Sequence, residues 1–259
     1  MSRPPQLRPR ARPAPPDGYW LGGRHAVAAA LEDGRVRRLV VAAGAAGLED
    51  AERAARHAGA SVERMVRSEL DRLAGGDAQG CAAWVRPLPT VSVDDLVAAG
   101  AQRPSALVVA CDHVQDPRNL GAIARTAAAV GAVGLLLPER RAAPIGPAVE
   151  RVAAGNLRAL RVAVVANLPT ALERLRRARF WVYGAAADGE QLYHRCAMDP
   201  RTVLVIGAEG RGLAPLVRRH CDMTLRLPLR APVESLNASA AAAVLLYEWA
   251  RHHGDADPG

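Results

Sequence analysis

The second half of the chain alternates short apolar runs with segments of helical periodicity, and this alternation limits the possible folds more than any other feature. Runs rich in Val, Leu and Ile predict strands at residues 107–111, 134–137, 160–165, 180–185, 203–207 and 223–227. The segments between and after them predict helices at 119–130, 147–154, 168–179, 214–220 and 238–252. Strands that are apolar on both faces are typical of a buried parallel sheet. Residues 104–252 therefore predict an α/β domain whose ligands gather at the carboxyl ends of the strands.

Residues 18–86 show the same alternation on a smaller scale. Predicted strands at 38–43, 61–66 and 81–85 are interleaved with predicted helices at 25–31, 49–57 and 69–73. This pattern predicts a small sheet covered by helices. We interpret the proline-containing segment 87–103 as an interdomain linker with one helical turn.

The two ends of the chain are expected to lie outside these domains. Residues 1–17 contain six prolines and four arginines, which predicts a mobile basic arm. Such an arm is either a solvated tail without a role or a segment that holds RNA. Residues 253–259 are expected to form a flexible tail.

The positive charge of the chain is carried by arginine, with no lysine. The 34 Lys+Arg residues are all arginine and outnumber the 26 Asp+Glu residues, which gives a net charge of +8. The absence of lysine excludes Schiff-base chemistry and the lysine of a phosphate-binding P-loop. A basic chain rich in arginine favours a polyanionic partner such as nucleic acid, because guanidinium groups pair with phosphates in a bidentate manner.

Several other classes of protein fit the sequence poorly. The four cysteines lie far apart and form neither a CxxC pair nor a cluster with zinc spacing, so we expect free thiols and no metal site. No apolar run approaches the length of a membrane span, and we expect no membrane partner. The N-terminus lacks the apolar region of a secretory signal, and a cytoplasmic location is expected.

Polar residues follow two of the predicted strands. After strand 107–111, Asp116 and Pro117 form a turn and Asn119 can cap the following helix. After strand 203–207 comes a glycine-rich turn that carries one carboxylate, Glu209. Its glycine order, G-x-x-G-x-G, does not match the dinucleotide-binding fingerprint. The sequence therefore does not favour a nucleotide-dependent oxidoreductase. An ordinary capped turn explains each segment when it is taken alone.

A third polar segment precedes the last predicted helix. Ser235, Asn237 and Ser239 crowd its N-terminus, where one N-cap would suffice. Three such groups indicate that something polar is held there, although local caps also explain them.

Taken in order, the three segments resemble the signature motifs of the SpoU-type (TrmH-like) RNA ribose 2′-O-methyltransferases of the SPOUT superfamily. The matches are to N-x-G-x-x-x-R (Asn119, Gly121, Arg125), to G-x-E-G-x-G (Gly207, Glu209, Gly210, Gly212) and to S-L-N-x-S (Ser235, Leu236, Asn237, Ser239). The resemblance covers about residues 104–251. A weaker one begins at residues 23–31, which resemble the opening of the family's small RNA-binding domain.

The resemblance implies a fold, a cofactor and a set of site residues. It implies the SPOUT fold, in which the C-terminal part of a parallel sheet forms a trefoil knot, and a homodimer that completes the active site. It implies S-adenosylmethionine as the cofactor. The implied cofactor contacts are Gly207, Leu227 and Leu236. The implied catalytic residues are Asn119, Arg125, Glu209, Ser235 and Asn237.

The resemblance also implies a substrate, a ribose 2′-hydroxyl. Within the family, a chain with this small N-terminal domain is most similar to enzymes that methylate a guanosine in a loop of 23S ribosomal RNA. Transfer RNA is the alternative substrate, and a non-catalytic RNA-binding paralogue is the alternative class. The chain departs from the family pattern at Leu229 and Ala231, where methionine and glycine are common, and at Ala78, where histidine is common.

Overall fold

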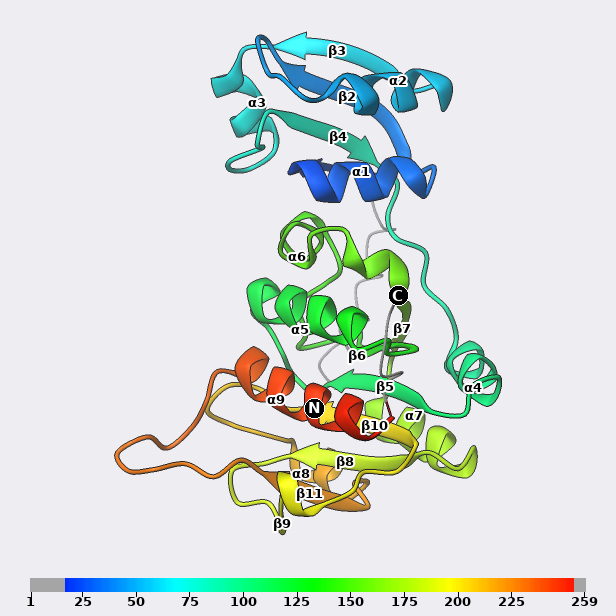
Figure 1. Cartoon of the computed structure of the whole chain (residues 1–259), viewed down its shortest axis with the longest axis vertical. Coiled ribbons are helices and arrows are strands. Elements are labelled where there is room, and N and C mark those ends of the chain that lie inside the picture. Colours follow the sequence, from blue (N-terminus) through cyan, green and yellow to red (C-terminus); the bar gives the residue numbers. More distant parts are fainter. Residues whose placement is uncertain (1–16, 254–259) are drawn as a thin grey trace, which may run out of the picture.

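The computed structural model describes residues 17–253, which form two units with separate sheets (Figure 1). The predicted basic arm at 1–17 and the tail at 253–259 lie outside the described residues, except for residues 17 and 253. In Figure 1 the small unit lies at the top and the larger unit, which contains the C-terminal helix, lies below it.

The small unit is a four-stranded mixed sheet with helices on both faces. Its elements are β1 (Tyr19–Gly22), α1 (Arg24–Glu32), β2 (Val36–Ala42), α2 (Glu49–His57), β3 (Ser61–Met65), α3 (Arg67–Leu73) and β4 (Cys81–Val85). The strand order is β1-β4-β2-β3, with β2 and β3 parallel and β4 antiparallel to both of its neighbours. The short β1 was not predicted, because four residues carry too little periodicity to indicate a strand.

The segment between the two units is more ordered than a linker with one helical turn. It contains α4 (Val93–Ala101), a helix of nine residues. Ser92 and Asp95 form a capping box at its start, and Leu96 is fully buried in the core of the larger unit. The short apolar run there is thus one face of an amphipathic helix, and α4 belongs to the larger unit.

The larger unit is built on a seven-stranded parallel sheet. Its strands are β5 (Ala106–Cys111), β6 (Gly134–Pro138), β7 (Arg161–Val165), β8 (Trp181–Ala185), β9 (Gln191–Leu192), β10 (Arg201–Ile206) and β11 (Met223–Arg226). Its helices, besides α4, are α5 (Pro117–Ala129), α6 (Pro147–Ala153), α7 (Leu168–Arg177), α8 (Pro215–Arg218) and α9 (Ala238–His253), with 3₁₀ turns at Asn156–Ala159 and Tyr193–Arg195. The strand order is β7-β6-β5-β10-β8-β11-β9, and all pairs are parallel. The parallel sheet expected from the apolar runs is confirmed.

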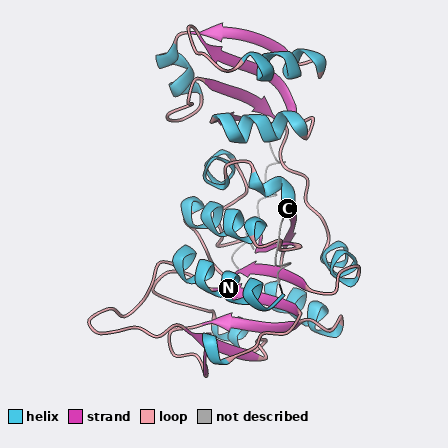
Figure 2. Ribbon diagram, viewed as in Figure 1, coloured by secondary structure: helices cyan, strands magenta, loops and turns pink. Residues whose placement is uncertain are grey.

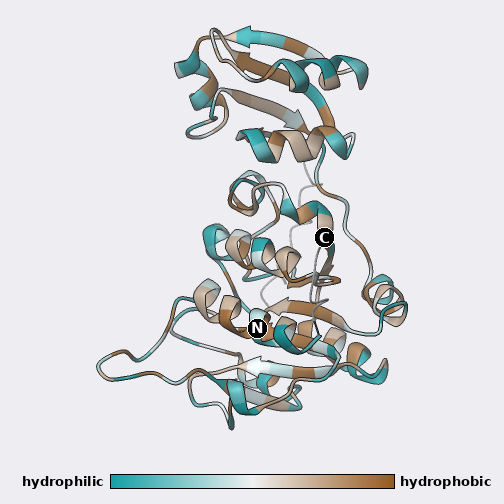
Figure 3. Cartoon of the chain, viewed as in Figure 1, coloured by the Kyte–Doolittle hydropathy of each residue, from teal (hydrophilic) through white to brown (hydrophobic). Residues whose placement is uncertain are grey.

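Helices cover both faces of this sheet, which explains why its central strands are mostly apolar (Figures 2 and 3). Leu107 and Val109 of β5 point into a core closed by α5, α6 and α9. Val108 and Ala110 of the same strand point into a second core closed by α4, α7 and α8. Because alternate residues of a strand face opposite sides, a strand covered on both sides, such as β5, is apolar at successive positions.

The two units are joined by a buried ion pair. Glu150 of α6 accepts hydrogen bonds from Arg35 Nη1 at 3.1 Å and Nη2 at 2.6 Å, and from the Tyr19 hydroxyl. The side chains of Arg35 and Glu150 are only 6% and 5% exposed. Burial raises the pKa of Tyr19, and the neighbouring Glu150 carboxylate raises it further. This contact fixes the small unit on α6 of the larger one.

None of the helices within residues 17–253 is long and apolar enough to cross a membrane.

Candidate active site

The glycine-rich turn after β10 closes on itself. The N–H of Ala208 donates to the carbonyl of Gly212 at 3.1 Å, and the N–H of Gly212 donates back to Ala208 at 2.9 Å. A Cβ at Gly207 would lie 2.4 Å from the carbonyl carbon of Gly212, so only glycine allows this closure. Gly210 and Gly212 have φ values of 71° and 63°, where other residues are strained. The closed turn holds Glu209 at the carboxyl end of the central strand β10.

Asp112 holds this turn against the end of β5. Its carboxylate is 1% exposed, and Oδ2 accepts a hydrogen bond from the N–H of Ala214 at 2.6 Å, two residues after the turn. The other carboxylate oxygen pairs with Nδ1 of His113. Sequence reasoning did not single out Asp112, although an acid placed directly after a buried strand was an available signal.

Asn119 is not the cap of α5. Asp116 is the N-cap, and its side chain accepts a hydrogen bond from the N–H of Arg118 at 2.8 Å. Pro117 follows as the first helical residue, a position that suits proline. The side chain of Asn119 is therefore free for another partner.

That partner is Asn237, which brings the three polar segments together. Its Nδ2 donates to Oδ1 of Asn119 at 2.9 Å and to Oε1 of Glu209. Its Oδ1 accepts from the N–H and the hydroxyl of Ser239, at 2.9 and 2.6 Å, and so caps α9. One amide thus links α5, the glycine-rich turn and the start of α9. We call Asn119, Glu209 and Asn237 the amide–carboxylate cluster.

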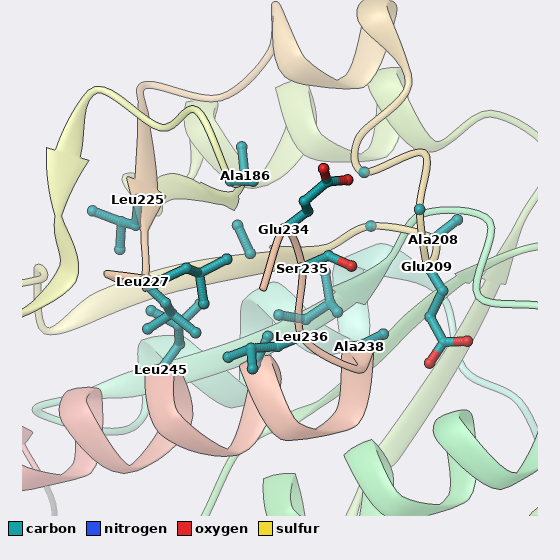
Figure 4. Close-up of a pocket in the computed structure, with 18 residues that line it drawn as sticks. Ala186, Ala208, Glu209, Leu225, Leu227, Glu234, Ser235, Leu236, Ala238 and Leu245 are labelled. Atoms are coloured by element: carbon teal, nitrogen blue, oxygen red, sulfur yellow. The ribbon is translucent and has the colours of Figure 1, made fainter. Parts of the chain in front are cut away.

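A cavity of about 310 Å³ opens beside this cluster (Figure 4). It is formed by residues 185–187 after β8, residues 206–212 after β10, and the segment from β11 to α9. The predicted cofactor contacts Gly207, Leu227 and Leu236 all line it, as do Glu209 and Ser235. Sequence reasoning missed Glu234 and the segment after β8, because neither belongs to the three motifs.

Arg125 lies away from the cluster. Its side chain is exposed and, among the described residues, forms no ion pair. Six residues separate it from Asn119, which on an α-helix is about 9 Å of rise and roughly 240° of rotation. Arg125 instead lines a second cavity, between α5, α6 and the small unit. Within one chain, the structure brings together Asn119, Glu209 and Asn237 but not Arg125.

Two family models match the chain over its two units. The model described as "SpoU rRNA Methylase family" matches residues 106–247. The model described as "RNA 2'-O ribose methyltransferase substrate binding" matches residues 20–91.

A curated relative supports the same grouping. An uncharacterized tRNA/rRNA methyltransferase from Synechocystis is 41% identical over 198 residues, which are 76% of this chain and 52% of the relative. The chain matches only about half the length of that relative.

Solved structures share the fold over nearly the whole chain. The SpoU methyltransferase AviRb from Streptomyces viridochromogenes, in complex with AdoMet, is 27% identical with a TM-score of 0.75, over 91% of this chain and 90% of that one. An rRNA methyltransferase from Sinorhizobium meliloti is 25% identical with a TM-score of 0.76, over 91% and 88%.

Proposed function

Because this chain belongs to the SpoU rRNA methylase family, we propose that it transfers a methyl group from S-adenosylmethionine to a ribose 2′-hydroxyl of RNA. The observation that carries the proposal is the amide–carboxylate cluster, which joins all three polar segments beside one cavity at the carboxyl edge of the sheet. A non-catalytic RNA-binding protein would not need this arrangement.

The lining of the 310 Å³ cavity fits the proposed cofactor. Leu227, Leu229 and Leu245 offer an aliphatic surface for the adenine ring, and the backbone from residue 206 to 212 offers polar groups. The carboxylate of Glu234 at the rim suits the cofactor's ammonium group or its ribose hydroxyls. Bound there, S-adenosylmethionine supplies a methyl group that its sulfonium makes electrophilic.

The protein then has to orient the acceptor hydroxyl and manage one proton. Glu209 is held by Asn237 and would take the proton of the ribose hydroxyl as the oxygen–methyl bond forms and the sulfur–methyl bond breaks. Ser235 on the cavity wall would orient the ribose. Arg125 keeps its proton, because a guanidinium is not deprotonated in proteins. We assign it an electrostatic role, the stabilisation of the developing alkoxide.

The position of Arg125 favours a dimeric site. Since Arg125 lies away from the cluster of its own chain, we propose that each site is completed by Arg125 of the partner subunit. Exposed apolar side chains support a homodimer: Tyr247 and Val244 of α9 are 59% and 40% exposed, and Leu236 is 41% exposed. We further propose that the segment from β10 to α9 forms the family's trefoil knot. After β11, near one edge of the sheet, the chain returns to pack α9 against α5, which follows the central strand β5 (Figure 1).

For the substrate we propose a guanosine in a loop of 23S ribosomal RNA. A 2′-hydroxyl is accessible in a loop, and the net charge of +8 suits the phosphates around it. Transfer RNA is the second candidate, because the name of the curated relative covers both RNAs.

The test is transfer of tritium from labelled S-adenosylmethionine to total RNA that lacks this modification. We expect one alkali-resistant dinucleotide in large-subunit RNA, and no transfer by Arg125→Ala, which should still bind the cofactor. Label in transfer RNA would show that the proposed ribosomal substrate is wrong, while the proposed reaction would stand. Label on a base, or normal transfer by Arg125→Ala, would contradict the proposal.

A further inference from the structure

The second cavity lies between the two units and has a volume of about 490 Å³. We call it the interdomain cavity. Its lining from the small unit is Gly23, His25, Ala26 and Gln79, and its lining from the larger unit is Arg125, Arg151, Val152, Ala154 and Asn156. Figure 1 shows α1 lying above α6, and these two helices supply His25, Ala26, Arg151 and Val152.

The charge of the interdomain cavity is positive. Arg125 and Arg151 line it together with His25, and no carboxylate does. The first turn of α1 also belongs to the lining, and its N-cap, Gly23, has no side chain. The N–H of Arg24 donates to Oε1 of Gln79 at 3.2 Å, and the N–H groups of His25 and Ala26 have no partner among the described residues. A helix N-terminus and two guanidinium groups around one space favour an anion there.

Arg151 has an unused hydrogen-bond donor. Its Nη2 donates to the carbonyl of Ala74 at 2.7 Å, which holds the side chain across the boundary between the units. Its Nε is shielded from solvent and has no hydrogen-bond partner among the described residues. Because Nε is shielded, a ligand oxygen in the cavity would contact Nη1 of Arg151, which has no hydrogen-bond partner among the described residues.

The shape of the interdomain cavity is fixed by the contacts between the units. The buried Arg35–Glu150 pair joins them on one side. On the other, α1 passes so close to Gly155 that a Cβ there would lie 2.8 Å from the carbonyl oxygen of His25. A cavity held in this way keeps its shape before the ligand arrives, and binding loses less free energy to ordering.

We propose that the interdomain cavity binds one nucleotide of a single-stranded segment of the RNA substrate. Arg125 and Arg151 pair with its phosphodiester. Gln79 Oε1 and Asn156 Nδ2 already bond to the protein, which leaves Nε2 of Gln79 and Oδ1 of Asn156 to contact the base or the ribose. The inference rests on the proposed function for the identity of RNA as the substrate. It adds a defined site for a second nucleotide of the bound RNA, lined by the same Arg125 that we place in the active site of the partner subunit.

The test is fluorescence anisotropy of the full chain with a fluorescein-labelled 12-nucleotide oligouridylate, without cofactor. His25→Glu places a carboxylate in the cavity at the first turn of α1, where a negative charge does not harm the helix. We expect its affinity to fall about tenfold. The matched control is His57→Glu, an exposed histidine on α2 that does not line the cavity, whose affinity should stay within about twofold.

A second pair of variants measures the phosphate contact directly. Arg151→Gln should weaken binding and make the slope of log affinity against log salt shallower by about 0.7. Arg177→Gln, an exposed arginine on α7 away from the cavity, should leave the slope unchanged. Unchanged binding in His25→Glu and Arg151→Gln, or equal losses in variants and controls, would overturn the inference. Failure of methyl transfer by the wild-type chain would instead refute the proposed function and leave this binding contrast intact.

Discussion

Replacing Glu150 with alanine should release the small unit from α6. The carboxylate accepts three hydrogen bonds, two from Arg35 and one from Tyr19, and both members of the ion pair are more than nine-tenths buried. Burial acts to lower the pKa of Arg35, but the hydrogen bond and the charge of Glu150, together with Tyr19, outweigh it and the pKa is raised. Without Glu150 the buried guanidinium keeps only a hydrogen bond to the carbonyl of Arg86 at 3.0 Å and a contact with Asp33 at 3.7 Å. Removing one partner of a buried pair costs about 3–5 kcal/mol.

Urea unfolding of the full chain, monitored by tryptophan fluorescence, measures this loss in the free energy of unfolding. Trp20 and Trp84 report on the small unit and Trp181 and Trp249 on the larger one. The double variant Arg35→Met, Glu150→Leu should lose less stability than Glu150→Ala, because it leaves no unpaired charge.

The exposed Glu139 provides the control for this measurement. Glu139→Ala should change the free energy of unfolding by less than about 0.5 kcal/mol. A loss below about 1 kcal/mol in Glu150→Ala, or a larger loss in the double variant, would refute the assigned role of the ion pair.

Three further predictions follow from the site. Asn237→Asp keeps the cap of α9 but places a carboxylate against Glu209. We expect circular dichroism to show a folded protein whose methyl transfer is reduced more than about a hundredfold. Normal transfer would contradict the role of the cluster. Gly207→Ala puts a Cβ against the backbone of its own turn, so calorimetry should show loss of S-adenosylmethionine binding; wild-type affinity would argue against the closed turn. Burial raises the pKa of Cys111 to about 12. The stability that the protonated thiol contributes is therefore present below about pH 8.5 and falls as the pH rises toward 12. Iodoacetamide should not label Cys111 at pH 8 unless urea is added, and rapid labelling of the native chain would contradict its burial.

The elements of the fold could be predicted well where their periodicity is local. The central strands of the parallel sheet face a core on both sides and form short apolar runs, while the helices between them show helical spacing, so both types can be recognised in short windows. The helix α2 (Glu49–His57) and the strand β4 (Cys81–Val85) have the bounds that the pattern predicts. The short strands β1 and β9 carry too few residues for any period to appear.

Contacts between distant segments could not be predicted in this way. Arg35 and Glu150 are 115 residues apart, and no local pattern connects them. The helix containing Asn119 and Arg125 was predicted, but its amphipathic pattern does not say which neighbour each face meets. The structure places Asn119 beside Asn237 and Arg125 in the interdomain cavity. The motifs indicated the chemistry, while the division of these residues between two cavities required the three-dimensional fold.

The most direct test of the central claim is a map of ribose 2′-O-methylation in cells. Ribosomal and transfer RNA would be compared by mass spectrometry between a strain without this gene and strains that express the wild-type chain or Asn237→Asp. We expect that one 2′-O-methyl group is lost on deletion, returns with the wild-type chain and stays absent with Asn237→Asp. An unchanged map on deletion, or full restoration by Asn237→Asp, would contradict it.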